Sequence, residues 1–102
     1  MTDRSALEAE WLDLTRRRLP SLARVRDWPV SADHCFQRIL LDHATGGVWY
    51  DAIPDRPAYR TAPDAVLARA VDLGRRVETG AAPLAPLNDQ SLAWRGKRGP
   101  NA

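Results

Sequence analysis

The sequence predicts an all-α fold, and three observations carry that prediction. Apolar residues recur at helical spacing in several long stretches, and no useful length of strand alternation appears. Glycine and proline mark the ends of those stretches. At 102 residues the chain has room for one domain. We therefore expect a bundle of about four helices over residues 1–95 and a flexible basic tail over residues 96–102.

The first helix is predicted over residues 5–18. Ser5 and Glu8 have the spacing of a capping box, in which each side chain satisfies a free backbone N–H group of the other. Acidic residues come early in this stretch and arginines late, as the helix dipole favours. Pro20 is expected either to end the helix or to open the next turn, and residues 21–27 are expected to form about one helical turn.

The second helix is predicted over residues 32–45 and should be the central one. Ser31 is its expected N-cap, and Gly46 with Gly47 supplies a left-handed stop. Its apolar stripe should share one core with the neighbouring helices. The expected members of that core are Trp11, Phe36, Ile39, Leu40, Leu67, Ala70 and Val71.

Residues 48–61 are rich in proline and aspartate and predict an ordered connector, because their apolar side chains can pin them to the core. A third helix is predicted over residues 62–79, with Gly80 as its stop. A short fourth helix follows over residues 85–95.

The charge pattern favours an anionic partner. The formal net charge is only +2, but the basic residues gather near residues 15–30 and at the C-terminus, where Trp94 adds an aromatic ring. Such a combination can contact phosphates and stack on a base. The hypothesis is a small helical binding module for nucleic acid, with an acidic protein surface as the second choice of partner. The residues expected to bind nucleic acid are Arg16, Arg17, Arg18, Trp94, Arg95, Lys97 and Arg98.

Several function classes find little support in the sequence. No apolar run approaches the ~20 residues of a membrane span, and the N-terminal residues are charged, so a cytoplasmic protein without a membrane partner is expected. Cys35 is the single cysteine, and on the apolar stripe it is expected to be structural. The histidines are too far apart for a recognised ligand pair, so we expect no metal and no cofactor. Autonomous catalysis is not expected.

The second helix also has a polar side that does not belong to its apolar stripe. His34, Arg38 and Asp42 lie at i, i+4 and i+8, so they share a helical face. This face is either solvated, with a local ion pair between Arg38 and Asp42, or it presents a polar site toward Trp49 or Trp94.

Four pieces of the sequence resemble a family of short bacterial proteins. They are Trp28-Pro29-Val30, Asp33-His34-Cys35-Phe36-x-Arg38-Ile39-x-Leu41-Asp42, Pro57-Ala58-Tyr59-Arg60 and Leu87-Asn88-x-Gln90-Ser91-Leu92-x-Trp94-Arg95-Gly96-Lys97. Members of that family are sometimes labelled as related to GNAT acetyltransferases. The present sequence lacks that superfamily's Arg/Gln-x-x-Gly-x-Gly/Ala loop, which holds the coenzyme A pyrophosphate, and it lacks strands for the mixed sheet.

The resemblance implies that polar residues of the second and fourth helices meet in one site. The residues that it brings together are Asp33, His34, Arg38, Asp42, Asn88, Ser91, Arg95 and Lys97. It also implies the alternative function, a small acyltransferase-type enzyme that would bind coenzyme A and use the region of His34, Cys35 and Arg38.

Overall fold

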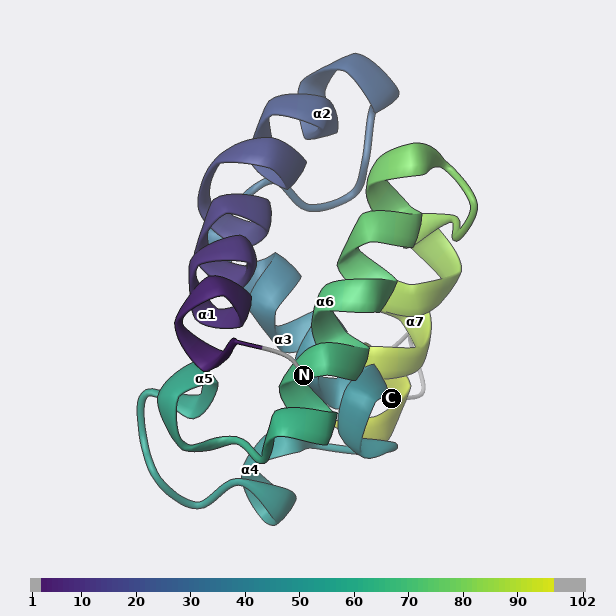
Figure 1. Ribbon diagram of the computed structural model, residues 1–102. Coiled ribbons are helices and arrows are strands. Elements are labelled where there is room, and N and C mark those ends of the chain that lie inside the picture. Colours follow the sequence, from purple (N-terminus) through teal and green to yellow (C-terminus); the bar gives the residue numbers. More distant parts are fainter. Residues whose placement is uncertain (1–2, 97–102) are drawn as a thin grey trace.

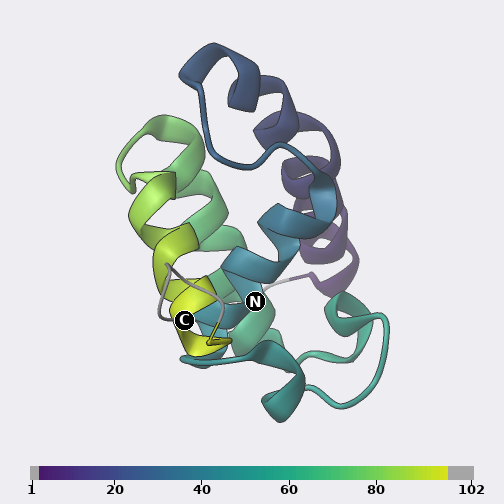
Figure 2. The ribbon, with the colours of Figure 1, turned by 180° about the vertical axis from the view of Figure 1, so that it is seen from behind.

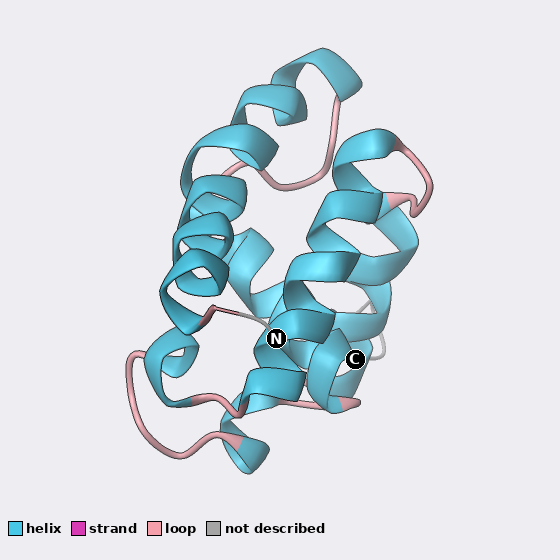
Figure 3. Cartoon of the chain, viewed as in Figure 1, coloured by secondary structure: helices cyan, strands magenta, loops and turns pink. Residues whose placement is uncertain are grey.

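A computed structural model describes residues 3–96, and every regular element within them is a helix, which confirms the all-α prediction (Figures 1 and 3). In chain order the elements are α1 (Arg4–Asp13), the π-helix η1 (Leu14–Arg18), α2 (Leu19–Arg26), α3 (Asp33–Thr45), α4 (Trp49–Ala52), α5 (Ala58–Thr61), α6 (Asp64–Thr79) and α7 (Leu84–Trp94).

The first helical rod is longer than predicted. α1, η1 and α2 follow one another without a break, so Pro20 does not end the rod but opens a further helix, the second of its two expected roles. Pro20 lies in the first turn of α2, directly after the π-helical turn. A proline inside a regular α-helix clashes with the carbonyl group four residues earlier. The wider π-turn relieves that clash, so the rod continues to Arg26.

The starts of two helices also differ from the prediction. Asp3 caps α1 by accepting a hydrogen bond from the Ser5 backbone N–H at 3.1 Å, so Ser5 is inside the helix and the expected capping box is absent. The N-cap of α3 is Ala32 rather than Ser31, and its side chain makes no cap hydrogen bond. Asp33 instead accepts from the His34 backbone N–H at 2.7 Å, which places a negative charge at the positive end of α3.

Helix α3 lies at the centre of the fold, as predicted. It contacts η1, α2, α4, α6 and α7, and the two opposite views show it enclosed between the α1–η1 rod and α7 (Figures 1 and 2). All seven residues expected in the core are at most 1% exposed. Gly46 ends α3 in the left-handed conformation, with φ of 78°, as the double glycine indicated.

Helices α6 and α7 match the predicted third and fourth helices to within two residues at each end. Gly74 of α6 is buried where α6 crosses the first rod. A Cβ atom there would lie 3.1 Å from Leu14 Cδ1 and 3.2 Å from Leu40 Cδ1, so the lack of a side chain allows the close approach. Gly80 then ends α6 with φ of 88°.

The connector between α3 and α6 is ordered, as predicted, and contains the short helices α4 and α5. Ile53 and Ala58 are buried, while Trp49 and Tyr59 are half-buried against the core. In the described part of the chain, no helix has both the length and the apolar character needed to cross a membrane. The predicted basic tail, apart from Gly96, lies outside the described residues.

Candidate functional site

A buried carboxylate joins α3 to α7. The side chain of Asp42 is 0% exposed and accepts four hydrogen bonds. Arg95 donates from Nε at 2.8 Å and from Nη2 at 2.9 Å, and Ser91 donates from Oγ at 2.7 Å. The backbone N–H of Trp49 donates the fourth bond at 3.0 Å. Asp42 therefore holds together the central helix, the last helix and the start of the connector.

Arg38 extends this network along α3. Its Nη1 donates to Ser91 Oγ at 2.8 Å and its Nη2 donates to Asn88 Oδ1 at 2.8 Å. The Ser91 hydroxyl thus accepts from Arg38 while it donates to Asp42. Because both acceptors of Arg38 are neutral, its positive charge has no carboxylate partner among the described residues.

The convergence implied by the resemblance is met in part. Arg38, Asp42, Asn88, Ser91 and Arg95 meet between α3 and α7. The hypothetical local pair of Arg38 with Asp42 is replaced by bonds from both residues to α7.

Asp33 and His34 stand apart from this network. Their side chains are 51% and 81% exposed near the start of α3, where they contact each other. Lys97, which the resemblance also placed there, lies outside the described residues.

The chemistry of this network is structural. Every buried side-chain nitrogen and oxygen in residues 3–96 has a hydrogen-bond partner, so the buried carboxylate of Asp42 and the Ser91 hydroxyl are fully used within the fold. The hydrogen bonds that Arg95 donates to the Asp42 carboxylate raise the pKa of Arg95 above its ordinary value, against the opposing effect of burial. The guanidinium is therefore permanently charged and permanently paired.

The first basic patch is also largely neutralised within the fold. Arg18 donates to Glu10 at 2.7 Å and to Glu78 of α6 at 2.8 Å. Arg17 is paired with Asp13 of the previous turn at 2.7 Å. Arg16 has no hydrogen bond or ion pair with any residue that the structure describes, and the same holds for Arg24 on α2.

The Arg18 cluster predicts a loss of stability in acid. Hydrogen bonds from Arg75 and Arg18 lower the pKa of Glu10, and a hydrogen bond from Arg18 lowers the pKa of Glu78, both from a usual 4.5. A carboxylate with a depressed pKa stabilises the fold above its unfolded pKa, and that stabilisation disappears as the pH falls through the folded value. Urea midpoints should therefore fall below a pH of about 4.5.

An Arg18→Gln variant is the matched test of that prediction. It should be less stable than the wild type at neutral pH, and the two midpoints should approach each other as the pH is lowered. Parallel curves at all pH values would show that the cluster does not cause the acid sensitivity.

At the C-terminal end, one of the cations predicted to bind nucleic acid is already paired within the chain. Arg95 is committed to Asp42, as described above. Trp94 is 37% exposed, and its ring lies 5.0 Å from the His43 ring. Lys97 and Arg98 lie outside the described residues. Of the cations that the sequence nominated, Arg17, Arg18 and Arg95 are therefore paired with carboxylates of the chain itself.

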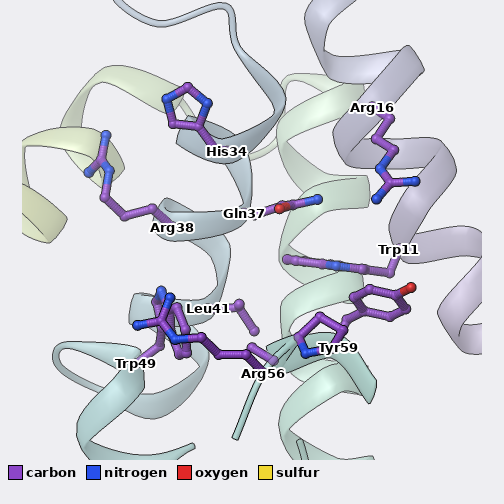
Figure 4. A pocket seen from close by; sticks show the side chains of 11 residues that line it. Trp11, Arg16, His34, Gln37, Arg38, Leu41, Trp49, Arg56 and Tyr59 are labelled. Carbon is purple, nitrogen blue, oxygen red and sulfur yellow. The ribbon is translucent and has the colours of Figure 1, made fainter. Parts of the chain in front are cut away.

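Arg16 lines a pocket of about 370 Å³ that lies between the first rod, α3 and the connector (Figure 4). The π-helix η1 carries Arg16 to its edge, and π-turns are frequent at functional sites. The lining residues come from these three segments of the chain. They are Trp11, Arg16, His34, Gln37, Arg38, Leu41, Trp49, Arg56, Pro57, Ala58 and Tyr59.

The polar groups of this pocket are mainly hydrogen-bond donors. Three arginines and two tryptophans in the lining can only donate, and the lining contains no carboxylate. The Arg56 guanidinium lies 5.2 Å from the centre of the Trp49 ring and has no ion-pair partner in the described chain. Figure 4 shows Arg38 with its guanidinium directed away from Arg16, toward α7, so Arg38 borders the pocket instead of filling it.

Trp11 places a donor on the pocket floor. Its side chain is 99% buried, since the residue is only 1% exposed, and Figure 4 shows its indole between Gln37 and Tyr59. The indole N–H has no acceptor among residues 3–96. Because no fully buried side-chain nitrogen or oxygen in this range lacks a partner, the indole nitrogen keeps some solvent access. Trp11 lines the pocket, so a ligand bound there lies beside this residue. A buried tryptophan N–H normally has a partner, which makes this donor a candidate contact for a ligand.

Sequence reasoning missed most of this pocket. Gln37 was passed over because it lies between apolar positions of α3, although its Nε2 donates to Thr15 Oγ1 at 3.0 Å and leaves its oxygen free for the pocket. Arg56 lies in the predicted connector but was not singled out, and Tyr59 was named in the family resemblance without a role in a pocket. The signal that was present is the mixture of aromatic residues and arginines in residues 48–61, which is unusual for a simple turn.

Other candidate chemistry is absent from the described residues. No group of three or more histidine, cysteine, aspartate or glutamate side chains is placed to hold a metal ion there. Cys35 is half-buried and is not among the residues that line the pocket. The second histidine, His43, is occupied at Nε2 by the Leu87 carbonyl oxygen at 2.9 Å.

Comparison with known proteins adds no family assignment, because no protein-family model, curated protein or solved structure matches this chain.

Proposed function

We propose that this protein is a small helical binding module whose partner is a nucleic acid. One observation supports the proposal above the others: a pocket rich in donors and free of carboxylates, with arginines that have no counterion in the described chain. Unpaired guanidinium groups beside one cavity repel each other and favour an anion that pairs with them. Phosphate oxygens are acceptors only, and planar guanidinium groups bind them in a bidentate manner.

The aromatic residues favour nucleic acid over an acidic protein surface. Trp49 and Tyr59 are half-buried beside the arginines, so part of each ring faces the pocket. Single-stranded nucleic acids bind where stacking rings and cations lie together. Aspartate and glutamate side chains on a protein partner would use the cations and leave the rings without a planar ligand.

Acyl transfer from coenzyme A has weaker support. His34 and Arg38 border the pocket, but Cys35 does not, and the Ser91 hydroxyl is completely buried in the network with Asp42. The alternative function therefore has neither its cysteine nor this serine beside the cavity and would depend on His34. Acetyl-coenzyme A is nevertheless a useful probe, because its binding would favour the transferase over a nucleic-acid module.

The proposal is tested by fluorescence anisotropy of a labelled single-stranded oligonucleotide at ~50 and ~200 mM salt. Binding should weaken steeply with salt, because each phosphate contact releases counterions and contributes about −0.7 to the log–log slope for a single strand. The double variant Arg16→Gln with Arg56→Gln should make that slope less negative by about 1.4.

Arg24→Gln is the matched control. Arg24 is exposed on α2 and is not part of the pocket, so its loss changes the net charge without changing the site. It should leave the slope close to that of the wild type. No binding at ~50 mM salt would overturn the proposal, and so would equal losses in the control and in the double variant.

A further inference from the structure

We infer that the pocket takes one unpaired nucleotide unit, with the base against its aromatic floor and the phosphate at its arginine edge. This inference rests on the proposed function and names its ligand: a nucleotide whose base is not part of a duplex. The observations that carry it are the unpartnered indole N–H of Trp11, the free oxygen of Gln37 and the position of the arginines around them.

The floor offers both kinds of hydrogen-bonding group. Trp11 presents a donor, and Gln37 presents an acceptor because its NH₂ group is bound to Thr15. Figure 4 shows these two side chains next to each other, and both point into the space between α3 and the first rod. The edge of a nucleobase carries donors and acceptors side by side, so it complements this pair. A bare phosphate, which only accepts, would leave the Gln37 oxygen unused.

The size and shape of the pocket exclude a base that is stacked in a duplex. A volume of about 370 Å³ is at the lower end of the range of roughly 300–1,000 Å³ that small-ligand pockets occupy. Trp11 is 99% buried, so a ligand must enter the cavity to reach it. Paired bases expose only their groove edges on a convex double helix, whereas an unpaired base can leave its strand and enter.

The edge of the pocket provides for the phosphate. Arg16 and Arg56 are exposed, come from opposite walls of the pocket and have no ion pair within the described chain. The Arg56 guanidinium lies over the Trp49 ring, so a planar cation and an aromatic ring are held side by side at this edge. The same chemistry is offered by a free mononucleotide and by one residue of a single strand.

The test compares three probes at the same salt concentration: a free mononucleotide, a single-stranded oligonucleotide and a hairpin duplex of the same composition. Tryptophan fluorescence reports entry of the base, and anisotropy or calorimetry reports affinity. The single strand should bind at least about tenfold more tightly than the duplex, because base stacking on aromatic residues supports only the unpaired probe. A mononucleotide that binds as tightly as the strand assigns the pocket to free nucleotides.

Two variants separate the pocket from the rest of the surface. Trp11→Phe keeps an aromatic ring and removes the N–H, so it should lower the affinity for the single strand about fivefold to tenfold without changing the weak binding of duplex. Should this change destabilise the core, Trp49→Leu provides the second test, because Trp49 is only half-buried and its loss removes the stacking ring. Trp94→Leu, outside the pocket, is the control and should change neither affinity.

The outcomes distinguish this inference from the proposed function. Equal affinity for the single strand and the duplex, with salt dependence that needs Arg16 and Arg56, would overturn the inference and leave the proposed function in place. Absence of binding to all three probes at ~50 mM salt would overturn both. Loss of binding in Trp94→Leu without loss in Trp49→Leu would move the site away from the pocket and overturn the inference.

Discussion

Replacing Asp42 by alanine is expected to lower the free energy of unfolding by about 3–5 kcal/mol, the usual cost of breaking a buried ion pair by removing one partner. The change deletes the acceptor of four hydrogen bonds and leaves Arg95 as a charge that is only 14% exposed. It also leaves the Ser91 hydroxyl and the Trp49 backbone N–H without their acceptor. The free energy of unfolding of a typical domain is roughly 5–15 kcal/mol, so the variant should be close to unfolding.

Urea denaturation measures this loss, and a double-mutant cycle with Arg95→Ala assigns it to the pair. The double variant should lose less than the sum of the two single losses, because removal of both charges leaves neither one buried and unpaired. Asp72→Ala is the control, since the Asp72 side chain is 66% exposed and its nearest cation lies at 3.9 Å. That variant should change stability by no more than about 0.5 kcal/mol. A similar small change in Asp42→Ala would show that the network does not stabilise the fold.

The helices were predictable where the sequence carries a complete local signal. α3 and α6 each combine an apolar stripe at helical spacing with a glycine that adopts positive φ at the end. Both parts of that signal lie within one helix, so no knowledge of neighbouring elements is needed. The seven residues of the predicted core are buried for the same reason.

The first rod shows where local signals fail. Pro20 is a strong helix-ending signal in an α-helix, but the π-turn before it changes the backbone geometry that the rule assumes. That turn places Leu14 and Thr15 next to each other in the core, where Leu14 packs on Gly74 and Thr15 accepts from Gln37. These contacts join residues far apart in the sequence, so they could not be predicted from the stretch around Pro20.

Much the same limit applies to the charged residues. Spacing correctly placed Arg38 and Asp42 on one side of α3, but it could not show that their partners would come from α7, about fifty residues away. Arg18 was interpreted as free for nucleic acid, although Glu78 binds it from sixty residues away. A cluster of basic residues in a sequence therefore overestimates the free positive charge, because ion pairs formed on folding neutralise some of the cations. Arg16 and Arg56 remain beside the pocket without a carboxylate partner among the described residues, and Arg24 remains so outside it.

Phe36→Ala is expected to cost about 3–5 kcal/mol, the range for removing a large aromatic side chain from a core. Phe36 is 0% exposed in the central helix, and its ring packs against Trp28 in an edge-to-face contact with 5.8 Å between the ring centres. Truncation leaves a cavity where the loop after α2 rests on α3. The melting temperature of the variant should therefore fall by more than about ten degrees, since 1 kcal/mol corresponds to about 4–8 °C in a domain of up to 100 residues.

Two control variants test whether the lost stability comes from the cavity at Phe36. Phe36→Leu restores most of the lost volume and should recover at least half of the lost stability, because the cost depends on the cavity that remains. Val25→Ala removes an apolar side chain that is 81% exposed and should change the free energy of unfolding by no more than about 0.5 kcal/mol. If Phe36→Ala melted like Val25→Ala, the packing of the loop on α3 would contribute little to stability. Because Phe36 does not line the pocket, a folded Phe36→Leu variant should bind the single-stranded probe as the wild type does.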